Sequence, residues 1–141
     1  MLKNYKVGQV KGDDRNLGNL IGWYAISREV NREMDGYPIL TDKDTVWFVA
    51  YKKLEVFAFA AVKQMKSHAI LTYSYVDPKF RRKGVYKRLL RDRLEWVEKK
   101  GIRKVKADCT AKSLSALKQE GFEVVKEFKN WTKVEKRYEN L

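Results

Sequence analysis

A chain of 141 residues with 44% hydrophobic and 13% aromatic residues can bury a core as one domain, and it is too apolar to be disordered. No apolar run approaches the roughly 20 residues of a membrane-spanning helix, and the polar N-terminus lacks the apolar segment of a secretory signal, so we expect a cytoplasmic protein with one domain over residues 1–141. A single Cys and a single His exclude a disulfide framework and a Cys/His zinc site, so no metal is expected.

The first half of the chain contains one helical and several extended patterns. A short strand is predicted at Tyr5–Val10. Apolar residues at helical spacing then predict helix from about residue 17 to residue 34, either as one helix or as two short ones, since Gly18 and Gly22 weaken it. β-branched and aromatic residues favour three further strands, at Thr45–Tyr51, Leu54–Val62 and Ser67–Val76. Short turns between these three runs indicate an antiparallel meander.

The second half predicts two helices and three strands. The helices lie at about Val85–Lys99 and at Ser113–Gln119, and the strands at Ile102–Cys109, Gly121–Phe128 and Trp131–Arg137. The strand–helix–strand unit over residues 67–109 requires a parallel crossover within an otherwise antiparallel sheet. The sequence therefore predicts an α/β fold with a mixed sheet of six to seven strands, mostly antiparallel, and about four helices on its two faces.

The segment between the predicted strand end at Val76 and the helix start at Val85 is dense in basic residues. Eight of the fifteen residues from Lys79 to Arg93 are Lys or Arg. The first amides of a helix have no acceptor within the helix, and its N-terminus carries roughly half a positive charge. Consecutive amides in a curled turn also bind phosphate oxygens. This turn is therefore predicted to bind a phosphate or a pyrophosphate.

The order Arg81-x-x-Gly84-x-Tyr86, preceded by Val76-x-Pro78, resembles the cofactor loop R/Q-x-x-G-x-G/A of the GNAT acyltransferase superfamily. Tyr86 stands where Gly or Ala is usual. It keeps its backbone amide for the pyrophosphate, but its ring has to point away from the cofactor. The resemblance implies a GNAT-like sheet whose two middle strands splay apart, with acetyl-CoA bound in the V between them.

The resemblance also implies a set of donor-binding residues. Tyr75 and Val76 would end the strand that bonds the pantetheine arm, and the Val76 amide would polarise the thioester carbonyl. Seven residues of the turn would wrap the pyrophosphate, namely Arg81, Arg82, Lys83, Gly84, Val85, Tyr86 and Lys87. Ser113 and Lys118 would lie near the other side of the cofactor. The implied activity is direct transfer of an acetyl or longer acyl group from acyl-CoA to a primary amine.

The residue that would deprotonate the amine is not evident. A lysine side chain costs about 4.6 kcal/mol to deprotonate at pH 7. Many GNAT enzymes place a Glu on the strand before the loop, and the matching position here is Ile70. His68, two residues earlier, has a suitable reference pKa, and Tyr75 or Tyr73 could order a water molecule. His68 and Tyr75 are the catalytic candidates, against the plainer interpretation that both are packing residues.

The family's downstream motif is only partly present. Gly121-Phe122 matches it, whereas Leu117 occupies the position of the Tyr that usually protonates the leaving thiolate. Ser113, Ser115, Cys109 or solvent could take that role. Cys109 is not favoured as a covalent nucleophile, because the sequence places no His or Asp partner for it.

The net charge of +13 leaves the acceptor open. Residues 77–100 contain ten Lys and Arg against four Asp and Glu, more than three cofactor phosphates require. The surplus positive charge indicates an acceptor linked to RNA or DNA. Two alternatives remain open: a protein acceptor, or charge that serves only solubility. A homodimer also remains open. An α-amino group costs only about 1.4 kcal/mol to deprotonate at pH 7, so it suits a site without an evident base. The rival hypothesis is a degenerate family member that binds acyl-CoA or nucleic acid without turnover.

The large aromatic residues admit two interpretations. They could form a platform for the acceptor, although large aromatics belong more often to a core. The residues concerned are Trp23, Tyr24, Trp47 and Trp131.

Overall fold

The computed structural model describes residues 2–138 except 28–29, 31 and 33–38. The seven strands are β1 (Lys6–Lys11), β2 (Thr45–Lys52), β3 (Glu55–Gln64), β4 (Ala69–Val76), β5 (Lys104–Cys109), β6 (Glu123–Glu127) and β7 (Thr132–Arg137). The described helices are α1 (Leu17–Ile26), α3 (Val85–Lys99), α4 (Ala111–Gln119) and the 3-10 turn η1 (Pro78–Phe80). The predicted continuation of the first helix to residue 34 falls largely outside the described residues.

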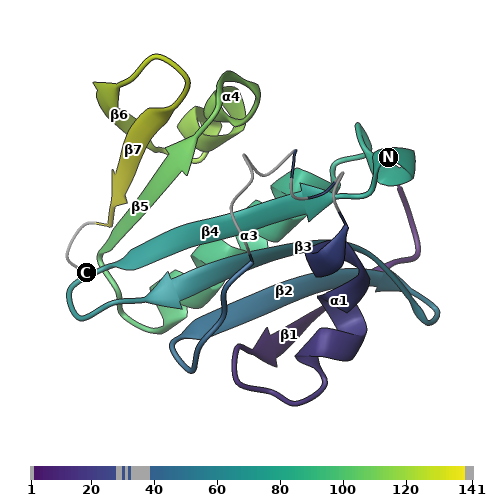
Figure 1. Cartoon of the computed structure of the whole chain (residues 1–141). Coiled ribbons are helices and arrows are strands. Elements are labelled where there is room, and N and C mark those ends of the chain that lie inside the picture. Colours follow the sequence, from purple (N-terminus) through teal and green to yellow (C-terminus); the bar gives the residue numbers. More distant parts are fainter. Residues whose placement is uncertain (1, 28–29, 31, 33–38, 139–141) are drawn as a thin grey trace.

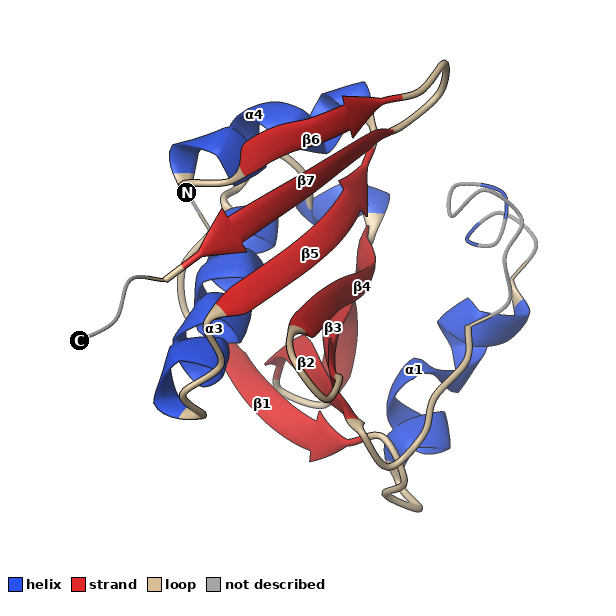
Figure 2. Ribbon diagram, turned by 90° about the vertical axis from the view of Figure 1, so that its left-hand side faces the viewer, coloured by secondary structure: helices blue, strands red, loops and turns tan. Residues whose placement is uncertain are grey.

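All seven strands form one sheet in the order β1-β2-β3-β4-β5-β7-β6. Every neighbouring pair is antiparallel except β4 and β5, which are parallel and joined by α3. Figure 2 shows α1 on one side of the sheet and α3 on the other. The predicted mixed α/β fold, its mostly antiparallel sheet and its single parallel crossover are confirmed.

The middle strands bury both of their faces. In β2, Phe48 and Ala50 belong to the cluster under α3 and α4, whereas Trp47 and Val49 belong to the cluster under α1. This alternation follows from the two-residue period of a strand. Both faces of β2 are therefore apolar, which explains why its sequence reads as a nearly continuous hydrophobic run.

Helix α3 carries the apolar stripe that covers one face of the sheet. Its buried apolar side chains are Val85, Leu89, Leu90, Leu94 and Val97. The opposite face is polar, as expected for an amphipathic helix. No described helix has the length and apolarity needed to cross a membrane.

Strands β4 and β5 separate soon after they begin. They pair only over Ala69–Leu71 and Val105–Ala107, and Figure 1 shows their C-terminal ends diverging. In β4, Thr72 pairs with β3 residue Ala61 and Ser74 with Ala60, so Tyr73 is an extra, bulged residue with φ of 43°. A bulge bends its strand, which accounts for the V-shaped gap at this point.

Candidate functional site

The turn that leads into α3 presents backbone amides at the open end of this gap. Gly84, the residue before the helix, has φ of 83°, and Arg82 has φ of 62°. The Arg88 amide makes the first helical bond, to the Gly84 carbonyl, so the amides of residues 85–87 precede the helical ladder. No described side chain caps them. Left-handed backbone at Arg82 and Gly84, followed by the amides of residues 85–87, forms a concave turn of the kind that binds anions.

Basic side chains surround this turn. Arg82, Lys83 and Lys87 are exposed beside the amides. Arg81 turns back toward β4, where its Nε donates to the Val76 carbonyl at 2.7 Å and its guanidinium carbon lies 5.4 Å from the centre of the Tyr75 ring. The turn and the end of β4 are thereby held together as one unit.

The end of β4 offers polar backbone groups to the gap. The Asp77 amide bonds to the Phe57 carbonyl of β3. Because the amides of a strand alternate in direction, those of Val76 and Ser74 point away from β3, toward the gap. The buried hydroxyl oxygens of Ser74 and Thr72 have no hydrogen-bond partner among the described residues. Such a wall fits the amide-rich pantetheine arm of coenzyme A, which could satisfy these groups.

A buried polar cluster lies beside the gap on the α3 side. Arg93 of α3 is 2% exposed and donates through Nη1 to the Ala61 carbonyl at 3.2 Å. The Tyr86 hydroxyl faces Arg93, Cys109 at the end of β5, and Ser113 in the first turn of α4. Burial raises the pKa of Tyr86, and Arg93 opposes that rise. The Tyr86 side chain therefore reaches across from α3 to β5 and α4.

The two catalytic candidates lie at opposite ends of β4. His68 precedes the strand at the closed end of the gap, where its ring nitrogen Nδ1 contacts the Ser67 hydroxyl at 3.0 Å. Burial and the nearby Lys106 and Lys104 lower the pKa of His68. Tyr75 packs on the α1 side against Tyr24 and Phe59. Seven positions along the strand separate them, roughly 20 Å, so His68 lies far from the open end of the gap.

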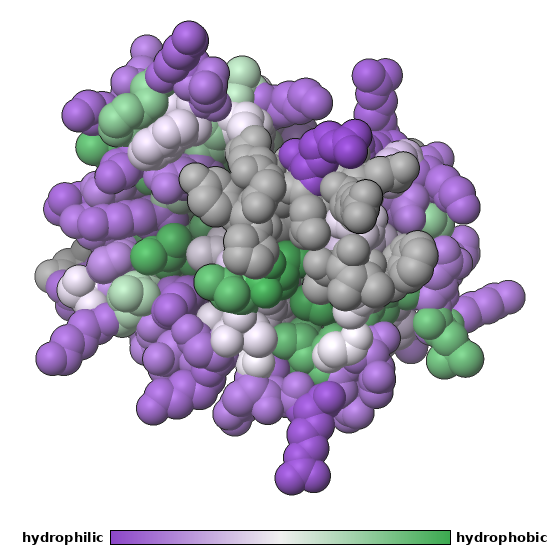
Figure 3. Space-filling view, in the orientation of Figure 1, coloured by the Kyte–Doolittle hydropathy of each residue, from purple (hydrophilic) through white to green (hydrophobic). Residues whose placement is uncertain are grey.

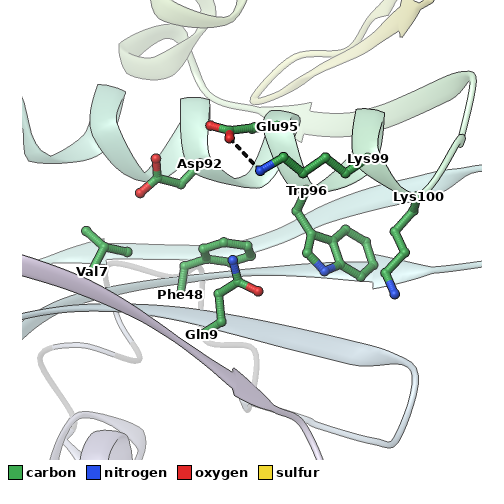
Figure 4. Close-up of a pocket in the computed structure, with 8 residues that line it drawn as sticks. All are labelled: Val7, Gln9, Phe48, Asp92, Glu95, Trp96, Lys99 and Lys100. Carbon is green, nitrogen blue, oxygen red and sulfur yellow. Dashed lines mark ion pairs between the residues drawn. The ribbon is translucent and has the colours of Figure 1, made fainter.

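The predicted pair Ser113 and Lys118 face different surroundings. Ser113 contacts Tyr86, whereas Lys118 lines a shallow hollow beside Leu114 and Ser115. A separate groove of about 520 Å³ lies between α3 and strands β1 and β2, away from the turn (Figure 4). Its polar lining includes the Glu95–Lys99 ion pair at 2.9 Å.

Two site features were not found from the sequence. One is Arg93. In the sequence it looks like one more residue of the basic run, but in the structure it is buried between α3 and the sheet. The other is the hydrogen bonding of Tyr24 of α1, which the sequence suggested only as a platform or core residue. Its hydroxyl donates to the Val56 carbonyl at 2.9 Å and to Asp77 at 3.3 Å. Burial and the Asp77 carboxylate raise the pKa of Tyr24. Tyr24 therefore anchors α1 to the start of the turn that leads into α3.

The large aromatics divide between core and surface. Trp47 is fully buried, and Tyr24 is 9% exposed. Trp131 is exposed and stacks on Phe128 at the tip of the β6–β7 hairpin, with ring centroids 4.0 Å apart. The side chain of Trp23 lies outside the described residues. Among the described side chains of the set, only Trp131 is exposed at the surface.

Part of the basic surface is internally paired. Arg88 pairs with Asp92 at 2.9 Å, and Arg91 pairs with Glu120 at 3.0 Å. Lys136 donates to the Glu120 carbonyl at the end of α4, so its ammonium has a structural role. Hydrophilic side chains nevertheless dominate the rim of the face shown in Figure 3.

Cys109 is expected to react slowly in the folded protein. It is 5% exposed, and burial and the neighbouring Asp108 raise the pKa of its thiol. At pH 8, we expect iodoacetamide to alkylate the native thiol at least about tenfold more slowly than the thiol in urea. Mass spectrometry over time measures both rates. Equal rates would show an accessible thiol and would return a covalent mechanism to consideration.

Comparisons with known proteins agree with this geometry. The family model described as Acetyltransferase (GNAT) family matches residues 15–119. No curated protein is significantly similar in sequence. The structure resembles the PaiA N-acetyltransferase from Thermoplasma acidophilum in complex with coenzyme A, with a TM-score of 0.67 and 17% identity over 96% of this chain and 100% of that one.

Two further solved structures have the same fold. The ribosomal-protein-S18-alanine N-acetyltransferase from Escherichia coli has a TM-score of 0.75 and 14% identity, covering 94% of this chain and 93% of that one. A GNAT family acetyltransferase from Elizabethkingia anophelis with acetyl-CoA bound has a TM-score of 0.68 and 12% identity, covering 97% of this chain and 100% of that one.

Proposed function

Because the chain belongs to the GNAT acetyltransferase family, we propose that it transfers an acetyl group directly from acetyl-CoA to a primary amine. The observation that carries the proposal is the conjunction of the free amides at residues 85–87 with the gap between β4 and β5. The turn would hold the pyrophosphate, and the gap would hold the pantetheine arm. The single buried thiol fits a cytoplasmic location.

The residues of this chain would act mainly by binding and positioning. Arg82, Lys83 and Lys87 would neutralise phosphate charge, and the amides of residues 85–87 would bond phosphate oxygens. The thioester carbonyl would accept a hydrogen bond from one of the two amides that face the gap, Val76 or Ser74. Such a donor stabilises the oxyanion that develops during transfer.

The acceptor amine should lose its proton easily. Strand β4 carries no Asp or Glu, and His68 lies at its far end. Deprotonation at pH 7 costs about 1.4 kcal/mol for an α-amino group and about 4.6 kcal/mol for a lysine side chain. An α-amino group therefore suits this site better. The likeness to an enzyme that acetylates the alanine of a ribosomal protein supports an α-amino acceptor.

We further propose that the acceptor is carried by RNA or another polyanion that contacts the β6–β7 hairpin. Cys109 of β5 pairs with Thr132 of β7, so the hairpin tip lies at the open end of the gap. At that tip Phe128 and Trp131 are partly exposed, and the Lys126 ammonium lies 5.0 Å from the Phe128 ring. Exposed aromatic rings with lysines bind unpaired bases and phosphates.

Binding and turnover distinguish the enzyme from a degenerate binding module. Calorimetry with acetyl-CoA tests the donor site, and incubation with labelled acetyl-CoA and fractionated protein, RNA, DNA and small molecules tests transfer. Label in one fraction supports the hypothesis of an acetyltransferase and identifies the class of its acceptor. Binding without label in any fraction supports the module, and absence of binding at millimolar acetyl-CoA contradicts both.

Exposed lysines at the hairpin tip are expected to contribute to polyanion binding. The double variant Lys126→Glu/Lys129→Glu should weaken binding of single-stranded RNA and lower the slope of log K against log salt by about 1.4, for two lost phosphate contacts. Fluorescence anisotropy between 50 and 200 mM salt measures both effects. The matched control Lys43→Glu/Lys66→Glu changes the same charge in turns at the closed end of the gap. Equal losses in both variants, or no RNA binding by the parent, would favour a protein or small-molecule amine.

A further inference from the structure

Arg93 is a buried cation whose position needs an explanation. It is 2% exposed, its Nε donates to the Leu89 carbonyl at 3.3 Å, and its Nη1 donates to the Ala61 carbonyl of β3 at 3.2 Å. None of the ion pairs formed by described residues includes it. Burying a charge without a carboxylate is costly, and an apolar side chain of similar volume is often at least as stable there. Stability is therefore a poor reason for an Arg at this position.

The guanidinium meets β3 at the bulge of β4. Ala61 pairs with Thr72 and Ala60 pairs with Ser74, so Tyr73 is the extra residue between the two pairs. A bulge disrupts the ladder of strand hydrogen bonds locally. The Ala61 carbonyl lies at the edge of this disruption, and the guanidinium gives it a donor from α3. The buried cation is thus bonded to the place where β4 bends.

The bulge decides which backbone amides face the gap. Beyond it, the Asp77 amide bonds to the Phe57 carbonyl. Because amides alternate along a strand, those of Ser74 and Val76 point away from β3. Without the extra residue the register of β4 on β3 would shift by one, and the same two amides would point toward β3. The bulge therefore sets the donors that we propose for the thioester carbonyl.

Arg93 also connects the bulge to the turn before α3. Its other polar neighbour is the Tyr86 hydroxyl, which faces Cys109 and Ser113 at the open end of the gap. The backbone amide of Tyr86 is one of the three that precede the helical ladder. One buried side chain thus spans the distance from the turn to the point where β4 and β5 part.

We propose that Arg93 is a positioning residue that fixes the spacing between the amides of the turn and the amides of β4. The inference rests on the proposed function, in which the turn holds the pyrophosphate of acetyl-CoA and β4 holds its thioester end. Arg93 acts through the Ala61 carbonyl and the Tyr86 hydroxyl rather than on the reacting atoms. A ligand that bridges two sites gains affinity only when their spacing fits its length. Arg93 would keep that spacing constant.

The test separates the two halves of the ligand by calorimetry. Acetyl-CoA is compared with phospho-ADP, the nucleotide half of coenzyme A, which keeps the pyrophosphate but cannot reach β4. In Arg93→Met, phospho-ADP should bind as it binds the parent. Acetyl-CoA should bind about tenfold more weakly, as expected for one misplaced hydrogen bond.

Two further measurements separate positioning from folding. The melting temperature of Arg93→Met should not fall, because Met has a similar length and no buried charge. Arg93→Lys should recover part of the acetyl-CoA affinity, because it keeps the charge and one donor group. A lower melting temperature, or equal losses for acetyl-CoA and phospho-ADP in Arg93→Met, would show that Arg93 serves only the fold and would overturn the inference.

Arg91→Met is the matched control. It removes the same charge from the same helix, but Arg91 is exposed and pairs with Glu120, so both ligands should bind this variant as they bind the parent. Unchanged binding of both ligands by Arg93→Met would contradict the positioning role while the donor site stands. Failure of both ligands to bind the parent would refute the proposed donor site, and the inference with it.

Discussion

Replacing Gly84 with Asp is expected to abolish binding of acetyl-CoA while the fold persists. The residue sits at φ of 83°, directly before the free amides of α3. An Asp side chain would bring a carboxylate to the place where a pyrophosphate is expected, and two like charges about 4 Å apart repel by roughly 4 kcal/mol near a protein surface. We expect the affinity to fall at least about 100-fold, or ~2.7 kcal/mol. Calorimetry measures the loss, and circular dichroism checks the fold.

Gly101→Asp is the matched control for this variant. Gly101 also has positive φ, at 73°, and a Cβ there would meet nothing within 4 Å. Gly101 lies just beyond the C-terminal end of α3, whereas Gly84 lies just before its N-terminal end. The control therefore introduces the same backbone strain and the same charge far from the turn that precedes α3. Gly101→Asp should bind acetyl-CoA like the parent. If Gly84→Asp also binds normally, the phosphates lie elsewhere on the protein.

Truncating Leu89 to Ala is expected to cause the largest loss of stability among the substitutions considered. Leu89 is fully buried between α3 and the sheet. Removing a buried leucine side chain costs about 2–5 kcal/mol through lost transfer energy and the cavity left behind. That is a large fraction of the 5–15 kcal/mol by which a typical domain is stable. Urea unfolding measures the free energy of unfolding in both proteins.

Leu54→Ala removes the same atoms from a side chain that is 102% exposed in the turn between β2 and β3. Its free energy of unfolding should lie within about 0.5 kcal/mol of the parent value. Similar losses in Leu54→Ala and Leu89→Ala would contradict the packing of α3 on the sheet.

The sequence by itself determined most of the fold. The α3 boundaries, Val85–Lys99, agree with the prediction because the helical period, the basic turn before it and Gly101 after it are all local signals. The described strands agree within a few residues for the same reason. The turn between Val76 and Val85 was also predicted locally, since a glycine, a proline and a cluster of Arg and Lys occur within one short segment; its role in binding a phosphate stays a prediction.

Only the tertiary structure decided which polar groups meet. The separation of Tyr86 from Ser113 along the chain gives no sign of contact, and the residues meet because α3 and α4 both begin at the open end of the gap. Arg93 reads as a surface residue within a basic run, yet the packing of α3 on the sheet buries it and brings its guanidinium to the Ala61 carbonyl of β3. His68 and Tyr75 share a strand but lie at its two ends. The chemistry of each side chain and the local patterns can be read from the sequence. Contacts between residues far apart in the chain depend on how the strands pair and on the β4–α3–β5 crossover, which no short segment specifies.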